Sequence, residues 1–202
     1  MLVHVLALLS AAGLVVNAAS IPLRPRQAAN STLATQSTYI ACVADTKIPS
    51  LTSSVATSAT SREECSNTCS QDNWEIAYFR QDTSQCYCSP ASDYPTSDEV
   101  VYAVDDQGNC RSEDDASVEY LHSPYALSGC YLYLTSEPIS NVTASSPLDC
   151  LNSCNTTSIA IRPELDSPSN QFVYECQCFG GEIGLGQVTD CGYGVEGVYQ
   201  RI

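Results

Sequence analysis

The twelve cysteines of this 202-residue chain fall into two copies of a single pattern. Each copy reads one cysteine, then C-x3-C, then C-x-C, then one final cysteine. The first copy is Cys42, Cys65, Cys69, Cys86, Cys88 and Cys110, and the second is Cys130, Cys150, Cys154, Cys176, Cys178 and Cys191. Because the order repeats while the spacing between the groups varies, the pattern predicts an internal duplication with loops of different length.

The N-terminal segment, residues 1–19, is typical of a secretory signal peptide. Its apolar stretch runs from Val5 to Val16 and is followed by small residues. That is shorter than the about 20 apolar residues of a membrane span, so we expect cleavage and secretion, with a retained anchor as the alternative. Residues 20–38 form a pro-segment or flexible lead-in, in which Arg26 is either a processing site or part of an uncleaved tail.

The charge of the chain restricts its partners. Eight basic residues face 23 acidic ones, a formal net charge of −15, which disfavours nucleic acid and anionic membrane surfaces. Neutral polysaccharides, extracellular proteins and cations remain as partners, and we expect no stable membrane insertion. Sequons predict N-glycosylation at Asn30, Asn141 and Asn155.

Two modules are expected, over residues 39–121 and 127–202. In each, a capping serine precedes C-x3-C, Ser61 in the first module and Ser146 in the second, which predicts a short helix carrying both cysteines. An antiparallel hairpin should follow, with the C-x-C cysteines on one face of its second strand. The expected fold class is α+β and disulfide-rich, with two tandem small modules, each an antiparallel sheet packed on a short helix.

Local similarities also align the two copies outside the cysteines. Ile76-Ala77 aligns with Ile159-Ala160, and Glu119-Tyr120 aligns with Val198-Tyr199. The expected disulfides are nested, joining the inner cysteine of each C-x3-C to the first of C-x-C. The nested pairs are Cys69–Cys86, Cys65–Cys88 and Cys42–Cys110, and Cys154–Cys176, Cys150–Cys178 and Cys130–Cys191. The crossed arrangement of the inner pairs is the alternative.

The chain resembles tandem WSC domain proteins of the secreted, fungal cell-wall type. The resemblance rests on the helical C-x3-C, on Cys86–Ser89 and Cys176–Gly180, on Cys191–Gly194 followed by Val198–Gln200, and on Tyr39 preceding Cys42. It implies adhesion, without chemistry, to a wall polysaccharide such as β-glucan. WSC domains usually have eight cysteines where each copy here has six, a number that is also similar to PAN/apple modules. A protein-binding or effector module and a passive glycosylated wall constituent are therefore the alternatives.

Catalysis is not expected. After signal removal His122 is the only histidine, and the cysteines are even in number in a chain predicted to be secreted, where thiols pair. We therefore expect no enzyme activity, no catalytic residue, no cofactor and no metal. The acidic run that begins at Asp105 lacks EF-hand spacing and is expected to be a solvated loop, with calcium binding as the alternative.

Aromatic residues near the first hairpin are the candidate ligand-binding site, because flat rings stack on sugar rings while polar neighbours bind the hydroxyls. The candidates are Trp74, Tyr78, Tyr87, Asp72 and Asn73. Positions in the hydrophobic core are the alternative for Trp74 and the tyrosines. In the second module a comparable surface would depend on Tyr131, Tyr133 or Tyr193.

Overall fold

The structure is a computed structural model that describes residues 37–50, 55–96 and 99–202. All of these belong to one compact unit. The predicted signal peptide, the sequon at Asn30 and the processing site at Arg26 lie outside the described residues, as does the lead-in up to residue 36.

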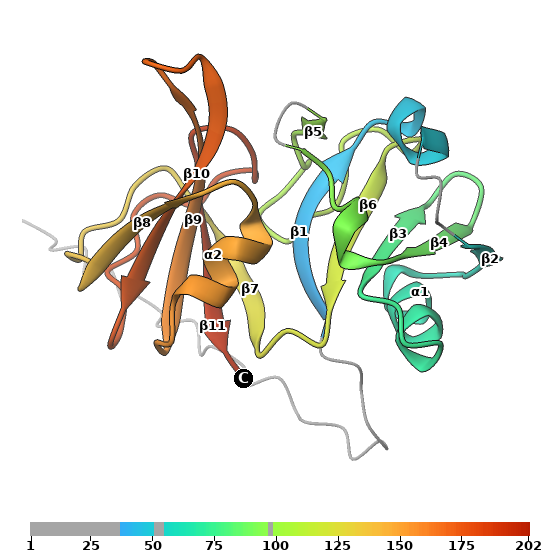
Figure 1. The fold of residues 1–202 in the computed structure, drawn as a ribbon, viewed down its shortest axis with the longest axis horizontal. Coiled ribbons are helices and arrows are strands. Elements are labelled where there is room, and N and C mark those ends of the chain that lie inside the picture. Colours follow the sequence, from blue (N-terminus) through green and yellow to red (C-terminus); the bar gives the residue numbers. More distant parts are fainter. Residues whose placement is uncertain (1–36, 51–54, 97–98) are drawn as a thin grey trace, which may run out of the picture. The chain divides into compact units, whose positions relative to one another are not determined.

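Two antiparallel sheets make up the fold (Figure 1). The first sheet has six strands in the order β2-β4-β3-β6-β1-β5. These strands are β1 (Ser37–Val43), β2 (Val55–Ser58), β3 (Ile76–Arg80), β4 (Gln85–Ser89), β5 (Val100–Val101) and β6 (Ala116–Leu121). Two 3-10 helices, η1 (Asp45–Ser50) and η2 (Ala91–Asp93), lie in its connections.

The second sheet repeats the strand order of the first. It has five strands in the order β7-β11-β9-β10-β8, which matches β1-β6-β3-β4-β2 strand for strand and lacks only a counterpart of β5. These strands are β7 (Tyr125–Tyr131), β8 (Ser140–Ala144), β9 (Ser158–Asp166), β10 (Gln171–Phe179) and β11 (Glu196–Arg201).

Each C-x3-C lies on a helix that begins at the predicted cap. Helix α1 (Arg62–Gln71) follows Ser61, whose Oγ accepts a hydrogen bond from the Glu64 N–H at 3.1 Å. The Glu64 carboxylate returns to the backbone N–H of Thr60 at 2.7 Å. The first contact satisfies an N–H group that the first turn of a helix leaves without a partner, and the second is similar to the return contact of a capping box but reaches the residue before the cap.

The second helix uses the same start signal. Helix α2 (Pro147–Ser153) follows Ser146, whose Oγ accepts from the Asp149 N–H at 3.0 Å. Pro147 occupies the first helical turn, where its missing N–H costs no hydrogen bond. Both predicted helices are confirmed.

Six disulfides include all twelve cysteines. The two outer pairs, Cys42–Cys110 and Cys130–Cys191, are as predicted. The nested inner pairs are wrong, because the structure has the crossed arrangement. The observed inner pairs are Cys65–Cys86 and Cys69–Cys88 in the first copy and Cys150–Cys176 and Cys154–Cys178 in the second. Together the disulfides fit an extracellular protein.

Strand direction explains the crossed pairs. Helix α1 leads into β3, and β4 pairs antiparallel with β3. A helix that packs antiparallel to the following strand therefore runs in the same direction as β4. The first cysteine of C-x3-C then lies next to the first of C-x-C, and the second next to the second. The spacings also match: four helical residues rise about 6 Å and two strand residues about 6.8 Å.

The two sheets have hydrophobic cores on both faces. On the helix side of each sheet the buried cysteines pack together with apolar residues, around Ala77 in the first sheet and Ile159 in the second. The opposite faces bury Tyr78 and Val118 in the first sheet and Phe179 and Val198 in the second. Among the described residues no helix is long and apolar enough to cross a membrane.

Strand register corrects the alignment of the two copies by one residue. Cys88 pairs with Ala77, whereas Cys178 pairs with Ile159, so Ala77 and Ile159 are structural equivalents. These two residues pair in turn with Glu119 and Tyr199. The alignment from sequence matched Ile76 with Ile159 and thereby placed equivalent residues on opposite faces, since strand side chains alternate.

Candidate functional site

The predicted aromatic platform of the first sheet is divided between two faces. Trp74 is half-buried and packs on the helix-side core beside the cysteines. Tyr87 is also half-buried, but it packs on the core of the opposite face. It alternates with Cys86 and Cys88, which point to α1, so Tyr87 has to point away from the helix. Trp74 and Tyr87 therefore do not form one surface.

Tyr78 is a core residue. Its side chain is only 1% exposed, and its hydroxyl donates a hydrogen bond to the Asp93 carbonyl at 2.5 Å. Burial raises the pKa of Tyr78, with the nearby carboxylates of Asp93 and Glu99 adding to the shift. The prediction of Tyr78 as a stacking residue is therefore wrong, and the alternative of a core position holds.

Asp72 and Asn73 stay beside Trp74 at the end of α1. Both are exposed, and Asn73 has a positive φ of 61°, a left-handed conformation that asparagine tolerates better than most residues. The turn is closed by the Trp74 N–H, which donates to the Cys69 carbonyl at 3.0 Å. Asp72, Asn73 and Trp74 thus form a small polar turn that contains a single aromatic ring. The sequence predicted a larger platform of several rings.

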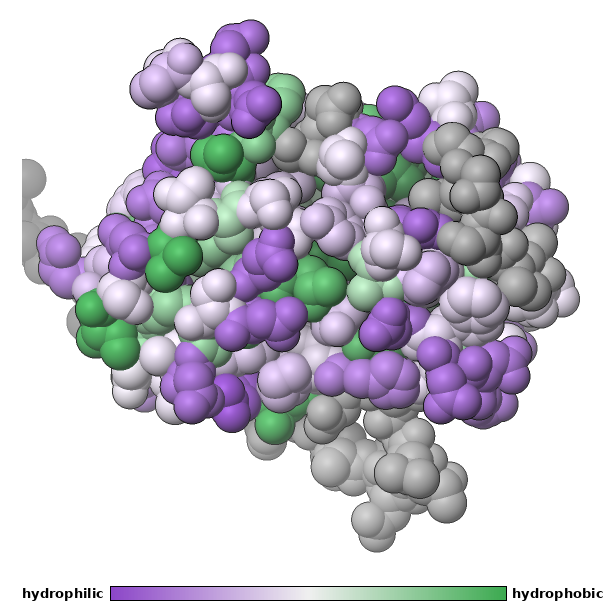
Figure 2. All heavy atoms as spheres, in the orientation of Figure 1, coloured by the Kyte–Doolittle hydropathy of each residue, from purple (hydrophilic) through white to green (hydrophobic). Residues whose placement is uncertain are grey.

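Exposed aromatic rings gather instead around the second sheet. Tyr193 and Tyr133 are exposed as a surface site would require, whereas Tyr131 is only 8% exposed and belongs to the core. Figure 2 shows several apolar patches over the second sheet on the face in view. Most exposed large apolar side chains of the described residues follow Cys130, namely Leu132, Tyr133, Ile139, Val142, Leu165, Phe172, Leu185, Val188, Tyr193 and Ile202.

Two of these exposed rings lie with the exposed ring of Tyr102 in what we call the aromatic ridge, made of Tyr102, Phe172 and Tyr193. Their exposed fractions are 48%, 39% and 46%. The rings of Phe172 and Tyr193 meet edge to face, with centroids 5.8 Å apart. A Cβ atom on Gly192 would lie 1.8 Å from Tyr102 Cδ1, so the Tyr102 ring rests directly on the backbone next to Tyr193.

The ridge is anchored on a two-stranded extension of the second sheet. Residues 164–166 of β9 and 171–173 of β10 pair only with each other, because β8 and β11 end earlier. Figure 1 shows this hairpin extending beyond the neighbouring strands. Phe172 pairs with Leu165 there, and the Leu165 N–H donates to the Tyr193 hydroxyl at 3.1 Å. The ridge is thus fixed by backbone contacts on both sides.

Tyr102 and Phe172 were not among the predicted site residues. Tyr102 follows two valines of a short strand, and Phe172 is the second residue of β10. Neither has a local motif. Tyr102 reaches the backbone at Gly192 because β5 ends close to Cys191, where the Ala103 N–H donates to the Cys191 carbonyl at 3.1 Å. Phe172 meets the Tyr193 ring from β10.

Charged residues form a separate cluster on the face of the second sheet opposite α2. Arg162 Nε lies 2.7 Å from Glu164 Oε1, and its Nη1 lies 3.6 Å from Glu196 Oε1. Glu196 is 3% exposed, and desolvation raises its pKa although Arg162 acts in the opposite direction. The cluster balances one guanidinium against carboxylates and shares no residue with the aromatic ridge.

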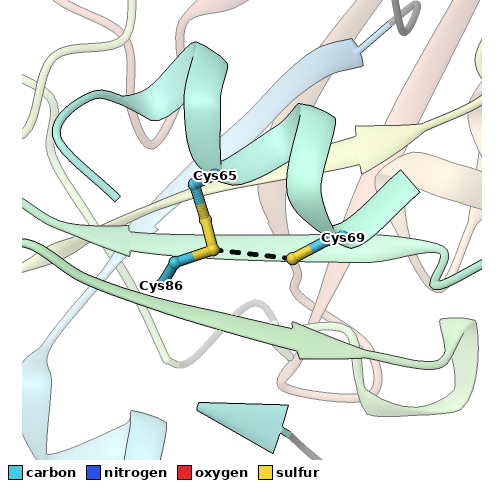
Figure 3. A group of neighbouring side chains, drawn as sticks. All are labelled: Cys65, Cys69 and Cys86. Atoms are coloured by element: carbon cyan, nitrogen blue, oxygen red, sulfur yellow. Dashed lines mark hydrogen bonds between the residues drawn. A yellow bond between two sulfur atoms is a disulfide. The ribbon is translucent and has the colours of Figure 1, made fainter. Parts of the chain in front are cut away.

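Three cysteine sulfurs beside α1 have the spacing of a metal site. Those of Cys65, Cys69 and Cys86 lie within 4.8 Å of one another (Figure 3). Cys65 and Cys86 are bonded to each other, and Cys69 is bonded to Cys88. Metal ligation requires thiolates, so in this oxidised form the group is two disulfides in contact.

Two predicted glycosylation sites lie among the described residues. Asn141 is exposed on the edge strand β8, and Asn155 is exposed just after α2. The Asn155 Oδ1 accepts from Arg201 Nη2 at 2.9 Å, which leaves its amide nitrogen available. Their modification stays a prediction.

Comparison with models of protein families, with curated proteins and with solved structures found no match.

Proposed function

We propose that this chain is a secreted, non-catalytic protein that adheres to cell-wall polysaccharide such as β-glucan. The aromatic ridge carries the proposal. Tyr102, Phe172 and Tyr193 offer partly exposed rings in fixed positions, and such rings stack on the apolar C–H faces of sugar rings. A pre-organised surface also loses little conformational entropy on binding.

The charge of the protein supports a neutral ligand. With a net charge of −15, the chain would repel acidic polymers. Its affinity for a neutral polymer would not depend on the salt concentration. Adhesion through the ridge should therefore persist at high ionic strength, in contrast to attachment through charge.

The duplicated layout supports the resemblance to tandem WSC domains. Both sheets have the same strand order, one capped helix, and disulfides that join C-x3-C to C-x-C. We propose that residues 39–121 and 127–202 are two tandem modules, of which the second supplies Phe172 and Tyr193.

A pull-down with insoluble β-glucan, chitin and cellulose tests the proposal on the oxidised mature protein. We expect retention on β-glucan, and Tyr193→Ala should weaken it about tenfold because the variant removes the central ring, with a smaller loss for Phe172→Ala. Tyr133→Ala is the matched control, since this exposed tyrosine lies outside the ridge. Trp74→Ala tests the platform predicted from sequence and should retain binding.

Binding that is equal in Tyr193→Ala and the unchanged protein would contradict the ridge. The absence of binding to all three polysaccharides would contradict the function and favour a PAN/apple-like role. The second sheet offers one feature for such a role: Leu132, Tyr133 and Val188 are about half exposed, and clustered apolar side chains of this kind suit a protein partner.

A further inference from the structure

A cleft of about 260 Å³ opens beside the N-terminus of α1, away from the aromatic ridge. Its main lining residues are Arg62, Phe79, Gln81, Asn109, Asp115 and Ser117. The volume is slightly below the about 300 Å³ at which pockets for small organic ligands begin, so it suits one small ring. It contains no residue of the ridge.

The floor of the cleft is a row of side chains across three adjacent strands. Phe79 on β3 pairs with Ser117 on β6, which pairs with Cys42 on β1. Disulfides close both ends of the row, because Cys42 is bonded to Cys110 and Phe79 pairs on its other side with Cys86. The cleft is therefore held open by covalent links and does not need a ligand to form it.

One polar group at the floor has no partner. Ser117 is 6% exposed, and its Oγ makes no hydrogen bond. A buried hydroxyl left without a partner costs about 1–3 kcal/mol. Because the Oγ itself has almost no accessible surface, the Ser117 side chain has to rotate toward the cleft, where a ligand hydroxyl would supply the missing bond.

The charges around the cleft favour an uncharged ligand. The Arg62 guanidinium is already engaged, with Nε 2.9 Å from Glu119 Oε1 and Nη1 donating to the Gly108 carbonyl at 3.1 Å. Desolvation and the neighbouring Asp114 raise the pKa of Asp115, so a further negative charge would be repelled. Side-chain amides, such as those of Asn109 and Gln81, bind neutral hydroxyls as donors and acceptors.

The equivalent place in the second sheet has the opposite chemistry. Relative to the paired cysteines, Phe79, Gln81, Asp115 and Ser117 correspond to Ile161, Pro163, Val195 and Gly197. That hollow lies beside α2, and only about 40 Å³ of it remains open, because Tyr39, Ile40 and Val101 of the first sheet line it. The hollow beside α2, which residues of the first sheet fill, has an apolar lining. The open cleft beside α1 has a polar lining.

We propose that the cleft beside α1 binds a single neutral sugar ring, with the apolar face of the ring on Phe79 and one hydroxyl bonded to Ser117 Oγ. This goes beyond the polysaccharide-binding ridge, since it assigns a second site with different residues. The ring is either a free monosaccharide or the end of a longer chain, and both present the same hydroxyls.

NMR titration of the oxidised mature protein with methyl β-glucoside and with a β-1,3-linked glucose trisaccharide tests the site and separates these sources. We expect amide shifts at Asn109, Asp115 and Ser117. Ser117→Ala should weaken binding about fivefold, the value of one hydrogen bond, while leaving the melting temperature unchanged or higher, since no protein hydrogen bond is lost. Ser89→Ala, at a fully buried serine on the opposite face, is the matched control and should bind normally.

Two results would overturn the proposal. One is the absence of shifts at the cleft with both probes, and the other is equal affinity in Ser117→Ala and the unchanged protein. Glucan pull-down of Ser117→Ala keeps the two proposals apart, because a working ridge retains the variant on the polysaccharide whether or not the cleft binds sugar.

Discussion

The two sheets share strand order and disulfides, yet they fill the space under their helices differently. In the first sheet the buried position opposite Ala77 is Glu119, which accepts from the Ser66 hydroxyl at 2.6 Å and pairs with Arg62. In the second sheet the equivalent position is Tyr199, which packs among apolar residues and cysteines. One helix is held by an ion pair between a buried glutamate and a partly exposed arginine, and the other by an aromatic ring.

The difference shows that the disulfide frame, meaning the two disulfides that join each helix to its sheet, tolerates either an ion pair or an aromatic ring under the helix. In both sheets two disulfides fix the helix to the strand, so side chains between them can change without loss of the helix position. Small units depend on such links because their cores alone provide little stability.

The largest expected effect breaks that frame. Replacing Cys69 and Cys88 together by alanine should lower the free energy of unfolding by about 3 kcal/mol, because the bond closes a loop of 19 residues in the unfolded chain. The matched change at Cys154 and Cys178, which are separated by 24 residues, should cost about the same. Guanidinium chloride unfolding measures both, and a cost below about 1 kcal/mol in either would contradict an equal role for the frames.

A second change separates the two ways of filling the core. Glu119→Ala should cost about 2 kcal/mol, because it leaves the Arg62 guanidinium without its buried partner. Glu119→Gln keeps the hydrogen bond to Ser66 and should cost less. Thermal unfolding measures the order of the two variants, and the reverse order would show that the charge of Glu119 contributes nothing.

Acid conditions should sharpen the comparison further. The raised pKa of Glu196 means that the folded protein holds this proton more tightly than the unfolded chain, so stability from this group falls as the pH rises above the ordinary range of glutamate. Glu196→Gln should therefore stabilise the protein by about 1 kcal/mol at pH 7, and by less at pH 4.5.

The first sheet has acids with the opposite shift. The hydrogen bonds from Thr60 lower the pKa of Glu64, and the bonds from Arg80 lower the pKa of Asp82. Their contribution is present at neutral pH and is lost as the pH falls through the lowered values. Unfolding of the unchanged protein and Glu196→Gln at both pH values tests the contrast, and an advantage of the variant that grows on acidification would contradict it.

The smallest expected effect concerns a surface ion pair between the two halves. Arg111 Nη2 lies 3.4 Å from Asp190 Oδ2, with both side chains about half exposed or more. Arg111→Ala should change stability by less than about 0.5 kcal/mol, because water and salt screen such pairs. A larger loss in thermal unfolding would show that charge, in addition to the apolar contacts of Tyr39, holds the halves together.

The elements of the fold were predictable because each cysteine spacing matches one backbone period. C-x3-C fits a helical turn and C-x-C one face of a strand, and Ser61 and Ser146 mark where the helices begin. The inner disulfides were predicted wrongly because their pairing depends on the direction of β4 relative to α1. That direction is set by β3, which lies between them in the chain.

The candidate sites were less predictable because they combine distant segments. Trp74, Tyr78 and Tyr87 are close in sequence, but Tyr78 and Tyr87 pair on the face opposite α1, whereas Trp74 packs on the helix side. The ridge joins the residue after β5, β10 and the loop after Cys191, and the cleft joins residues 60–62, 79–81 and 109–117. No local pattern indicates that these segments meet.

The way in which the hollow beside α2 is closed has a practical consequence for dissecting the chain. Tyr39, Ile40 and Val101 come from the first half, so a recombinant fragment that starts at residue 123 would expose Ile161, Val195 and the Tyr199 ring to water. Such a fragment would tend to self-associate through this exposed apolar surface. Studies of the second half in isolation should therefore retain the β1 segment, joined through a linker, so that it covers these residues.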